Sequence, residues 1–164
     1  MNEDLKRILD AREERWMKKQ QLSKEGAVVC MTLRMPRELR VSEEGIAFFE
    51  RMKQRFSAYA EGLSLAFKAE GSGADGPYCM WMAGHAHAAK HAAIAFEEEI
   101  PGGELLDIDV TSGSLSDLSR SDFGYPPRRC AVCGVNDARI CAGNQKHDRA
   151  ETVNVFARKM KQYM

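Results

Sequence analysis

Residues 77–110 read PYCMWMAGHAHAAKHAAIAFEEEIPGGELLDIDV and contain signals for a strand, a helix and a second strand. The apolar and aromatic run at 77–82 predicts a strand. Residues 85–99 are rich in Ala and end in three Glu residues, which predicts a helix that Pro-Gly-Gly at 101–103 stops. Residues 105–110 predict the second strand. A helix between two strands indicates a crossover connection and a sheet with helices packed against it.

Two helices and one further strand are predicted before this unit. Apolar residues near helical spacing predict a helix over roughly residues 3–22. Ala27–Met35 (AVVCMTLRM) predicts a strand that Pro36 ends. From Glu43 to Leu63, apolar residues recur every three or four positions, which predicts a second helix. Gly71–Gly76 lacks large side chains and is predicted to be a loop.

The expected fold is a single α/β domain over residues 1–164. Its core is a β-α-β-α-β sheet sandwiched by helices, and the N-terminal helix and a C-terminal helix around residues 153–160 flank it. A basic segment rich in Cys and His, residues 126–147, forms a knuckle within the same domain. A chain of 164 residues and 18.4 kDa holds one domain with a substantial core.

Basic and acidic residues balance at 24 each, but their distribution along the chain is uneven. Net charge is +3 over residues 1–40, −8 over 41–119 and +5 over 120–164, which suits an anionic ligand better than a long nucleic-acid track. The longest uncharged run, residues 76–89, has 14 residues, too few to cross a bilayer. The charged N-terminus lacks the apolar stretch of a secretory signal. We therefore expect a cytoplasmic protein without a membrane partner.

Asp107 and Asp109 stand two positions apart in the predicted strand 105–110, so both project from one side while the apolar residues face the other. Two carboxylates placed in this way can hold one Mg²⁺ ion that also contacts substrate phosphates. The alternative is an edge strand with one polar side facing solvent.

Four potential metal ligands follow the pattern C-x2-C-x7-C-x5-H: Cys130, Cys133, Cys141 and His147. A C-x-x-C turn presents two thiolates to one ion, and zinc takes four nitrogen or sulfur ligands in a tetrahedron. The x7 spacing is shorter than in most zinc modules, so a thiol-rich packed knuckle without metal is the alternative. Five Cys is an odd number for a chain expected in the cytoplasm, which argues against a disulfide framework.

Arginines and histidines provide two further sets of candidates. Three arginines in the basic C-terminal part of the chain, residues 120–164, either bind a phosphate-bearing ligand, because guanidinium groups pair bidentately with phosphate oxygens, or form an exposed basic face. They are Arg120, Arg128 and Arg129. Three histidines near the start of the helix 85–99 either form a metal or general-base site or are polar residues at a helix start. They are His85, His87 and His91.

Several of these segments recur together in a known order and spacing. The segments are Ile8-Leu9-Asp10-Ala11-Arg12-Glu13-Glu14-Arg15, Leu105-Leu106-Asp107-Ile108-Asp109-Val110, Leu118-Ser119-Arg120 and Pro126-Pro127-Arg128-Arg129-Cys130-x-x-Cys133, followed by Cys141-Ala142 and His147. In this arrangement the chain resembles the apo-citrate lyase phosphoribosyl-dephospho-CoA transferases over about residues 3–160. The combination of D-I-D-V with P-P-R-R-C-x-x-C carries the specificity of the resemblance.

The resemblance implies a nucleotidyltransferase-like enzyme. Such an enzyme attaches 2′-(5″-triphosphoribosyl)-3′-dephospho-CoA to a serine of the citrate lyase acyl carrier subunit and releases pyrophosphate. It implies that Asp107 and Asp109 hold Mg²⁺ on the triphosphate and that one of them orients or deprotonates the carrier serine. It also implies that the Cys/His cluster is a structural clasp for the Arg128-Arg129 segment. The phosphate-binding arginines would be Arg12, Arg15, Arg120, Arg128 and Arg129.

The chain departs from the family pattern near the expected phosphate site. Arg34-Met35-Pro36-Arg37 stands where Asn-Ile-Pro-Gly is usual, and Ile100–Glu104 stands where His-Pro-Leu-Gly-Arg is usual. Gly143 replaces a basic residue after the third Cys. Glu104 in place of Arg weakens an anion site unless Arg34 or Arg37 compensates, so the donor or the carrier can differ from those of the family.

A second hypothesis comes from another class of function. A non-catalytic zinc-knuckle module would bind an acidic partner or a nucleic acid through the knuckle and the Arg-rich ends of the chain. It predicts stoichiometric zinc and salt-dependent binding without turnover. Aromatic residues are sparse among the basic ones, which argues against single-stranded nucleic acid.

Overall fold

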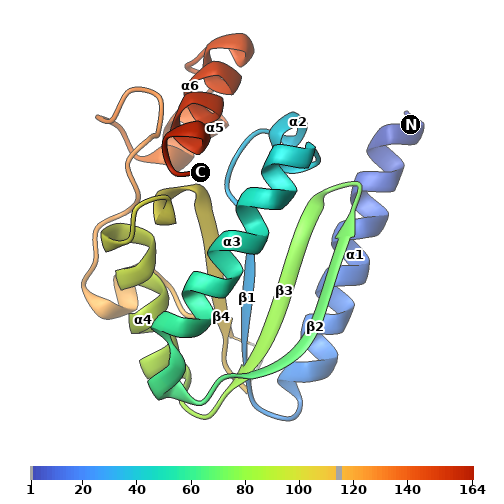
Figure 1. Cartoon of the computed structure of the whole chain (residues 1–164), viewed down its shortest axis with the longest axis vertical. Coiled ribbons are helices and arrows are strands. Elements are labelled where there is room, and N and C mark those ends of the chain that lie inside the picture. The colour runs from blue at the N-terminus through green and yellow to red at the C-terminus, as the bar shows by residue number, and fades with distance from the viewer. Residues whose placement is uncertain (1, 114–115) are drawn as a thin grey trace.

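The computed structural model describes residues 2–113 and 116–164 (Figure 1). The helices are α1 (Glu3–Ser23), α2 (Arg37–Arg40), α3 (Glu43–Tyr59), α4 (Ala86–Glu99), α5 (Ala138–Gly143) and α6 (Arg149–Gln162). The strands are β1 (Ala27–Leu33), β2 (Ala66–Gly73), β3 (Gly76–Ala83) and β4 (Leu106–Thr111). Short 3-10 turns are η1 (Glu61–Leu63), η2 (Gly103–Leu105) and η3 (Arg120–Phe123).

The strands form one sheet in the order β2-β3-β1-β4, and every neighbouring pair is antiparallel. The connection β1-α3-β2 therefore joins two parallel strands with β3 between them, and β3-α4-β4 joins two parallel strands with β1 between them. A tight hairpin links β2 to β3. This is the β-α-β-β-α-β arrangement of ferredoxin-like sheets, with α1 added before it and the knuckle and α6 after it.

The predicted order β-α-β-α-β omitted β2, and the loop predicted at Gly71–Gly76 was wrong. Gly71 to Gly73 belong to β2, and Ala74 and Asp75 form the turn into β3. Most β2 residues are exposed, so this edge strand forms by backbone pairing with β3 and leaves little apolar alternation in the sequence. Gly76 supplies the turn with a φ of +98°, which glycine adopts without a Cβ clash.

The two faces of the sheet carry different layers. α3 and α4 cover one face and enclose the larger core, in which Phe48, Phe56 and Phe96 are buried. α1 lies on the opposite face, where its Leu22 packs near Cys30 and the other buried residues of that side. The described residues include no helix that is both long enough and apolar enough to span a membrane.

Candidate active site

The two aspartates of β4 lie on the face of the sheet that carries α1. Leu106, Ile108 and Val110 alternate with them and are fully buried in the larger core. Register places Asp107 opposite Thr32 and Asp109 opposite Cys30 on β1, so these four side chains share one face. The Asp107 side chain is 48% exposed and therefore accessible to a ligand.

The carboxylate pair is electrostatically suited to a cation. Burial raises the pKa of Asp109, and the negative charge of Asp107 raises it further, while Lys19 and Lys90 act in the opposite sense. A divalent cation between the two carboxylates would remove the repulsion, and carboxylate oxygens are ligands that Mg²⁺ prefers. Within residues 2–113 and 116–164, this pair gains no third acidic, Cys or His ligand, so water and substrate oxygens would complete the coordination of such an ion.

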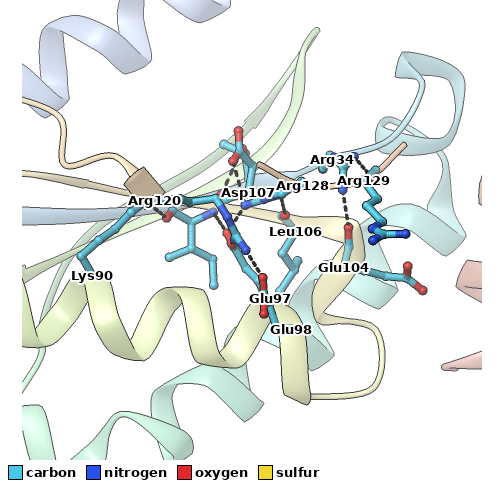
Figure 2. A network of polar contacts seen from close by, with 12 residues as sticks. Arg34, Lys90, Glu97, Glu98, Glu104, Leu106, Asp107, Arg120, Arg128 and Arg129 are labelled. Atoms are coloured by element: carbon cyan, nitrogen blue, oxygen red, sulfur yellow. Dashed lines mark hydrogen bonds and ion pairs between the residues drawn. The ribbon is translucent and has the colours of Figure 1, made fainter. Parts of the chain in front are cut away.

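Arg128 and Arg120 lie at the outer edge of β4 (Figure 2). Arg128 donates to the Leu106 carbonyl oxygen at 2.7 Å and to the Asp107 carboxylate at 3.3 Å, and it forms an ion pair with Glu97. Arg120 donates to Glu97 at 3.2 Å and pairs with Glu98. Carboxylates of the protein therefore already partner these two of the five predicted phosphate-binding arginines.

Arg12 and Arg15 belong to a separate cluster around Asp75, in the β2–β3 turn. Their guanidinium nitrogens lie 3.0 and 3.1 Å from the Asp75 carboxylate, and that of Arg40 lies at 2.8 Å. Arg37 donates to the adjacent Ala74 carbonyl at 3.0 Å. Burial alone would raise the pKa of Asp75, but the three guanidinium groups outweigh it and hold the pKa below its usual range.

The structure thus divides four of the five predicted arginines between two clusters, and the Arg129 side chain donates instead to the Gly134 carbonyl oxygen at 3.3 Å. Both clusters occur at the end of the sheet where β1 finishes and where β3 and β4 begin, as the register of Leu33 with Leu106 shows. Sequence reasoning missed Asp75 and Arg40. The spacing of Arg12 and Arg15 on one helix face was the signal available for a shared partner, but it does not identify a residue 60 positions away.

Arg34 and Glu104, two of the departures from the family pattern, lie next to Arg129. Arg34 donates to the carbonyl oxygens of Glu104 at 3.4 Å and Arg129 at 3.3 Å. Glu104 directs its carboxylate to Lys159 at 2.9 Å and to the Tyr163 hydroxyl at 3.1 Å. The charge of Glu104 is therefore balanced locally by Lys159.

The Cys/His cluster assembles as the spacing predicted. One ligand atom from each of the four residues, Cys130, Cys133, Cys141 and His147, lies within 4.8 Å of the others. His147 Nε2 is buried and has no hydrogen-bond partner. Backbone N–H groups of Asn136 and Val135 lower the pKa of Cys133 to about 6, which favours the thiolate form that binds metals. The cluster could hold a metal ion, and its donor set is typical of structural zinc sites.

The three histidines near the start of α4 do not form a comparable cluster. His87 and His91 pack against Phe123, with ring centroids 5.3 and 5.6 Å away. His91 Nδ1 also lies 3.3 Å from the Tyr125 hydroxyl. Among the residues that the structure describes, His85, His87 and His91 belong to no group of three or more potential metal ligands.

Comparison with known proteins places these features in a family. The family described as apo-citrate lyase phosphoribosyl-dephospho-CoA transferase matches residues 3–163. The chain belongs to this family. Its membership supports a transferase role for the chain.

Individual relatives of this transferase family differ in length. An apo-citrate lyase phosphoribosyl-dephospho-CoA transferase from Escherichia coli O1:K1 is 31% identical over 147 residues, covering 88% of this chain and 78% of the relative. A probable enzyme of the same name from Streptococcus pyogenes is 27% identical over 151 residues, with coverages of 88% and 78%. Protein CitXG from Haemophilus influenzae is 31% identical over 157 residues. The match covers 92% of this chain but only 33% of that relative.

Proposed function

We propose that the protein attaches 2′-(5″-triphosphoribosyl)-3′-dephospho-CoA to a serine of the citrate lyase acyl carrier subunit in the cytoplasm. The serine oxygen forms a bond to the phosphorus nearest the ribose, the bond from that phosphorus to the outer two phosphates breaks, and pyrophosphate leaves. The serine hydroxyl loses its proton. The observation that carries the proposal is a carboxylate pair on β4, of which Asp107 is half-exposed, at the end of the sheet where arginines gather.

Asp107 and Asp109 would hold Mg²⁺, which when bound supplies charge neutralisation on the triphosphate. Asp107 is the more accessible carboxylate and would orient the carrier serine or accept its proton. Arg12 and Arg15 would bind donor phosphates, and Arg37 and Arg40 of the same cluster would add positive charge.

The arginines of the other cluster would act at closer range to the carboxylates. Arg128 contacts Asp107 directly and would hold both Asp107 and an adjacent phosphate. Arg129 would bind phosphate from the neighbouring backbone position. Arg120 faces Glu97 and Glu98, so its contribution would be to hold Glu97 in place.

The experiment is an intact mass measurement of the apo acyl carrier subunit after incubation with the protein, the triphosphoribosyl-dephospho-CoA donor and Mg²⁺. We expect a mass gain equal to the donor minus pyrophosphate. Asp107→Asn should lower turnover about 10²- to 10³-fold with the fold retained, because it weakens the metal site without changing side-chain size. Asp10→Asn, a change at an exposed carboxylate on α1, is the matched control.

We also infer that the Cys/His cluster holds zinc and fixes the Arg128-Arg129 segment next to it. The unpartnered, buried His147 Nε2 within 4.8 Å of three thiols supports this assignment. Metal analysis should find one zinc per chain, which is lost in Cys141→Ser and retained in Cys79→Ala, a thiol of β3 outside the cluster. A folded, zinc-free wild type would contradict the assignment.

The competing function is a non-catalytic zinc-knuckle module. This function predicts a folded, zinc-loaded protein that produces no mass gain on the carrier. It also predicts salt-dependent binding of an acidic partner. A mass gain that Asp107→Asn abolishes excludes it.

A further inference from the structure

Ile108, the residue between the two aspartates, has an unusual set of backbone partners. β4 is an edge strand, so alternate backbone groups point away from β1 and need partners from outside the sheet. At Ile108 the backbone N–H donates to the Glu97 carboxylate at 2.7 Å, and the carbonyl oxygen accepts from the Lys90 ammonium at 3.3 Å. Both side chains come from α4 (Figure 2).

Other groups complete the outer edge of β4 on either side of Ile108. Arg128 donates to the Leu106 carbonyl, and the Leu118 backbone N–H donates to the Val110 carbonyl at 2.9 Å. Charged side chains therefore occupy the positions that a further strand would fill along Leu106 and Ile108, the segment that carries Asp107. A backbone segment takes over only beyond Asp109.

Lys90 and Glu97 are buried to a degree that is rare for charged residues. They are 5% and 4% exposed, and removing each charge from water carries a large desolvation penalty unless it is paired. Arg128 and Arg120 pair with Glu97. Neutral side chains would satisfy an edge strand with a smaller desolvation penalty, so the charges point to a use beyond covering the edge.

The neighbours of Ile108 indicate what the buried charges of Lys90 and Glu97 act on. Lys90 holds the carbonyl oxygen of Ile108, the group that directly precedes Asp109, and Glu97 holds Arg128, which contacts Asp107. The two α4 residues thus act on the backbone between the aspartates, and Glu97 also reaches Asp107 through Arg128.

We propose that Lys90 and Glu97 are positioning residues that fix Asp107 and Asp109 by holding both backbone groups of Ile108. The proposal rests on the proposed transferase function of that pair. In this proposal, neither Lys90 nor Glu97 contacts the substrate. They set the separation and direction of the carboxylates, on which a shared cation and the in-line approach of the serine depend.

The test compares Lys90→Met, Glu97→Gln and Glu97→Ala with two matched controls, Lys53→Met and Glu99→Gln. Lys53 is a lysine of α3 that pairs with Glu50 and Glu70, and Glu99 is an exposed carboxylate at the C-terminal end of α4. Three quantities are measured: carrier turnover, hydrogen exchange of the Ile108 amide, and Mn²⁺-induced broadening of the amide signals of residues 106–110. Mn²⁺ serves as the probe for the Mg²⁺ site.

We expect Lys90→Met to lower kcat about 10- to 100-fold with an unchanged KM for the carrier, and to weaken Mn²⁺ binding about fivefold or more. Glu97→Gln keeps an oxygen that accepts from the Ile108 N–H but loses its charge. It should therefore retain slow exchange at Ile108 and lose less activity than Glu97→Ala. The controls should match the wild type in all three measurements.

A folded Lys90→Met variant with wild-type Mn²⁺ broadening and wild-type kcat would overturn the proposal and leave Lys90 as a cover for the strand edge. Equal kcat losses in Glu97→Gln and Glu97→Ala would overturn the role of the Ile108 N–H contact. If the wild type itself gives no mass gain on the carrier, the proposed function fails, and the Mn²⁺ broadening in Lys90→Met still decides whether α4 positions the carboxylates.

Discussion

Asp75 and Glu97 are both almost fully buried carboxylates that hold several arginines, yet they differ in charge balance. Each side chain is 3% exposed. Three guanidinium groups converge on Asp75 and lower its pKa. Burial between α4 and β4 raises the pKa of Glu97 in spite of Arg128 and the Ile108 N–H. The same pairing chemistry therefore produces opposite pKa shifts because the ratio of countercharge to desolvation differs.

The difference separates two roles for arginine at this end of the sheet. The Asp75 cluster contains three paired arginines and one carboxylate, which leaves positive charge for an anionic ligand. In the Glu97 cluster, two arginines meet three carboxylates, those of Glu97, Glu98 and Asp107. The first cluster suits phosphate binding, and the second suits the positioning of strand β4.

Removing the Glu97 carboxylate should have the largest effect on stability. Glu97→Ala leaves the Ile108 N–H without its acceptor and Arg128 without its buried countercharge, so we expect unfolding free energy to fall by about 3–5 kcal/mol. Urea denaturation followed by circular dichroism measures it. A loss below about 1 kcal/mol would show that the cluster contributes little to the fold.

Asp75→Asn should destabilise the protein by about 2–3 kcal/mol at pH 7, because it leaves three arginines without their shared carboxylate. The folded pKa of Asp75 lies below its unfolded value of about 3.9, so its stabilisation is present above that pH and is lost as pH falls through the folded pKa. The deficit of the variant relative to wild type should therefore shrink below about pH 4. Denaturant midpoints between pH 3 and 7 test this, and a deficit independent of pH would contradict it.

Gly76→Ala should destabilise the protein by about 1–3 kcal/mol through the geometry of the Asp75 turn. Gly76 has a φ of +98°, and an added Cβ would lie 2.9 Å from the Cβ of Arg40. The same change at Gly124, which also has positive φ (+73°) but open space around it, is the control for backbone strain alone. Thermal denaturation of both variants separates strain from the displacement of Arg40, and equal losses would show that Arg40 is not displaced.

Arg12→Gln should have the smallest effect on stability, within about 1 kcal/mol, because its side chain is 51% exposed. Its effect on anion binding should be larger, with affinity for inorganic triphosphate reduced about tenfold. Isothermal titration calorimetry measures this affinity. Arg7→Gln, at an exposed arginine of α1 that pairs with Glu3, is the control and should bind triphosphate as the wild type does.

Local sequence patterns were sufficient for most elements and for two groups of candidate ligands. The helices at the N-terminus and from Glu43 were predicted close to their observed bounds from apolar residues at helical spacing. The helix before Pro101 was predicted from its Ala-rich composition and the Pro-Gly-Gly that stops it. The alternation in Leu105–Val110 placed both aspartates on one face, and the Cys/His spacing predicted the cluster that the structure assembles. The motifs in their order also predicted the family. Apart from the family motifs, which are spread over residues 8–147, these features depend on residues close together in the chain.

Only the tertiary structure decided which distant groups meet. β2 is exposed and forms through backbone pairing, which leaves no apolar pattern to recognise. Arg12 and Asp75 are 63 positions apart, and Lys90 reaches the Ile108 carbonyl across 18. Ion pairs and edge-strand contacts of this kind depend on how the helices dock on the sheet. Local propensity and periodicity record which face of an element is buried, but they do not record the partner that buries it.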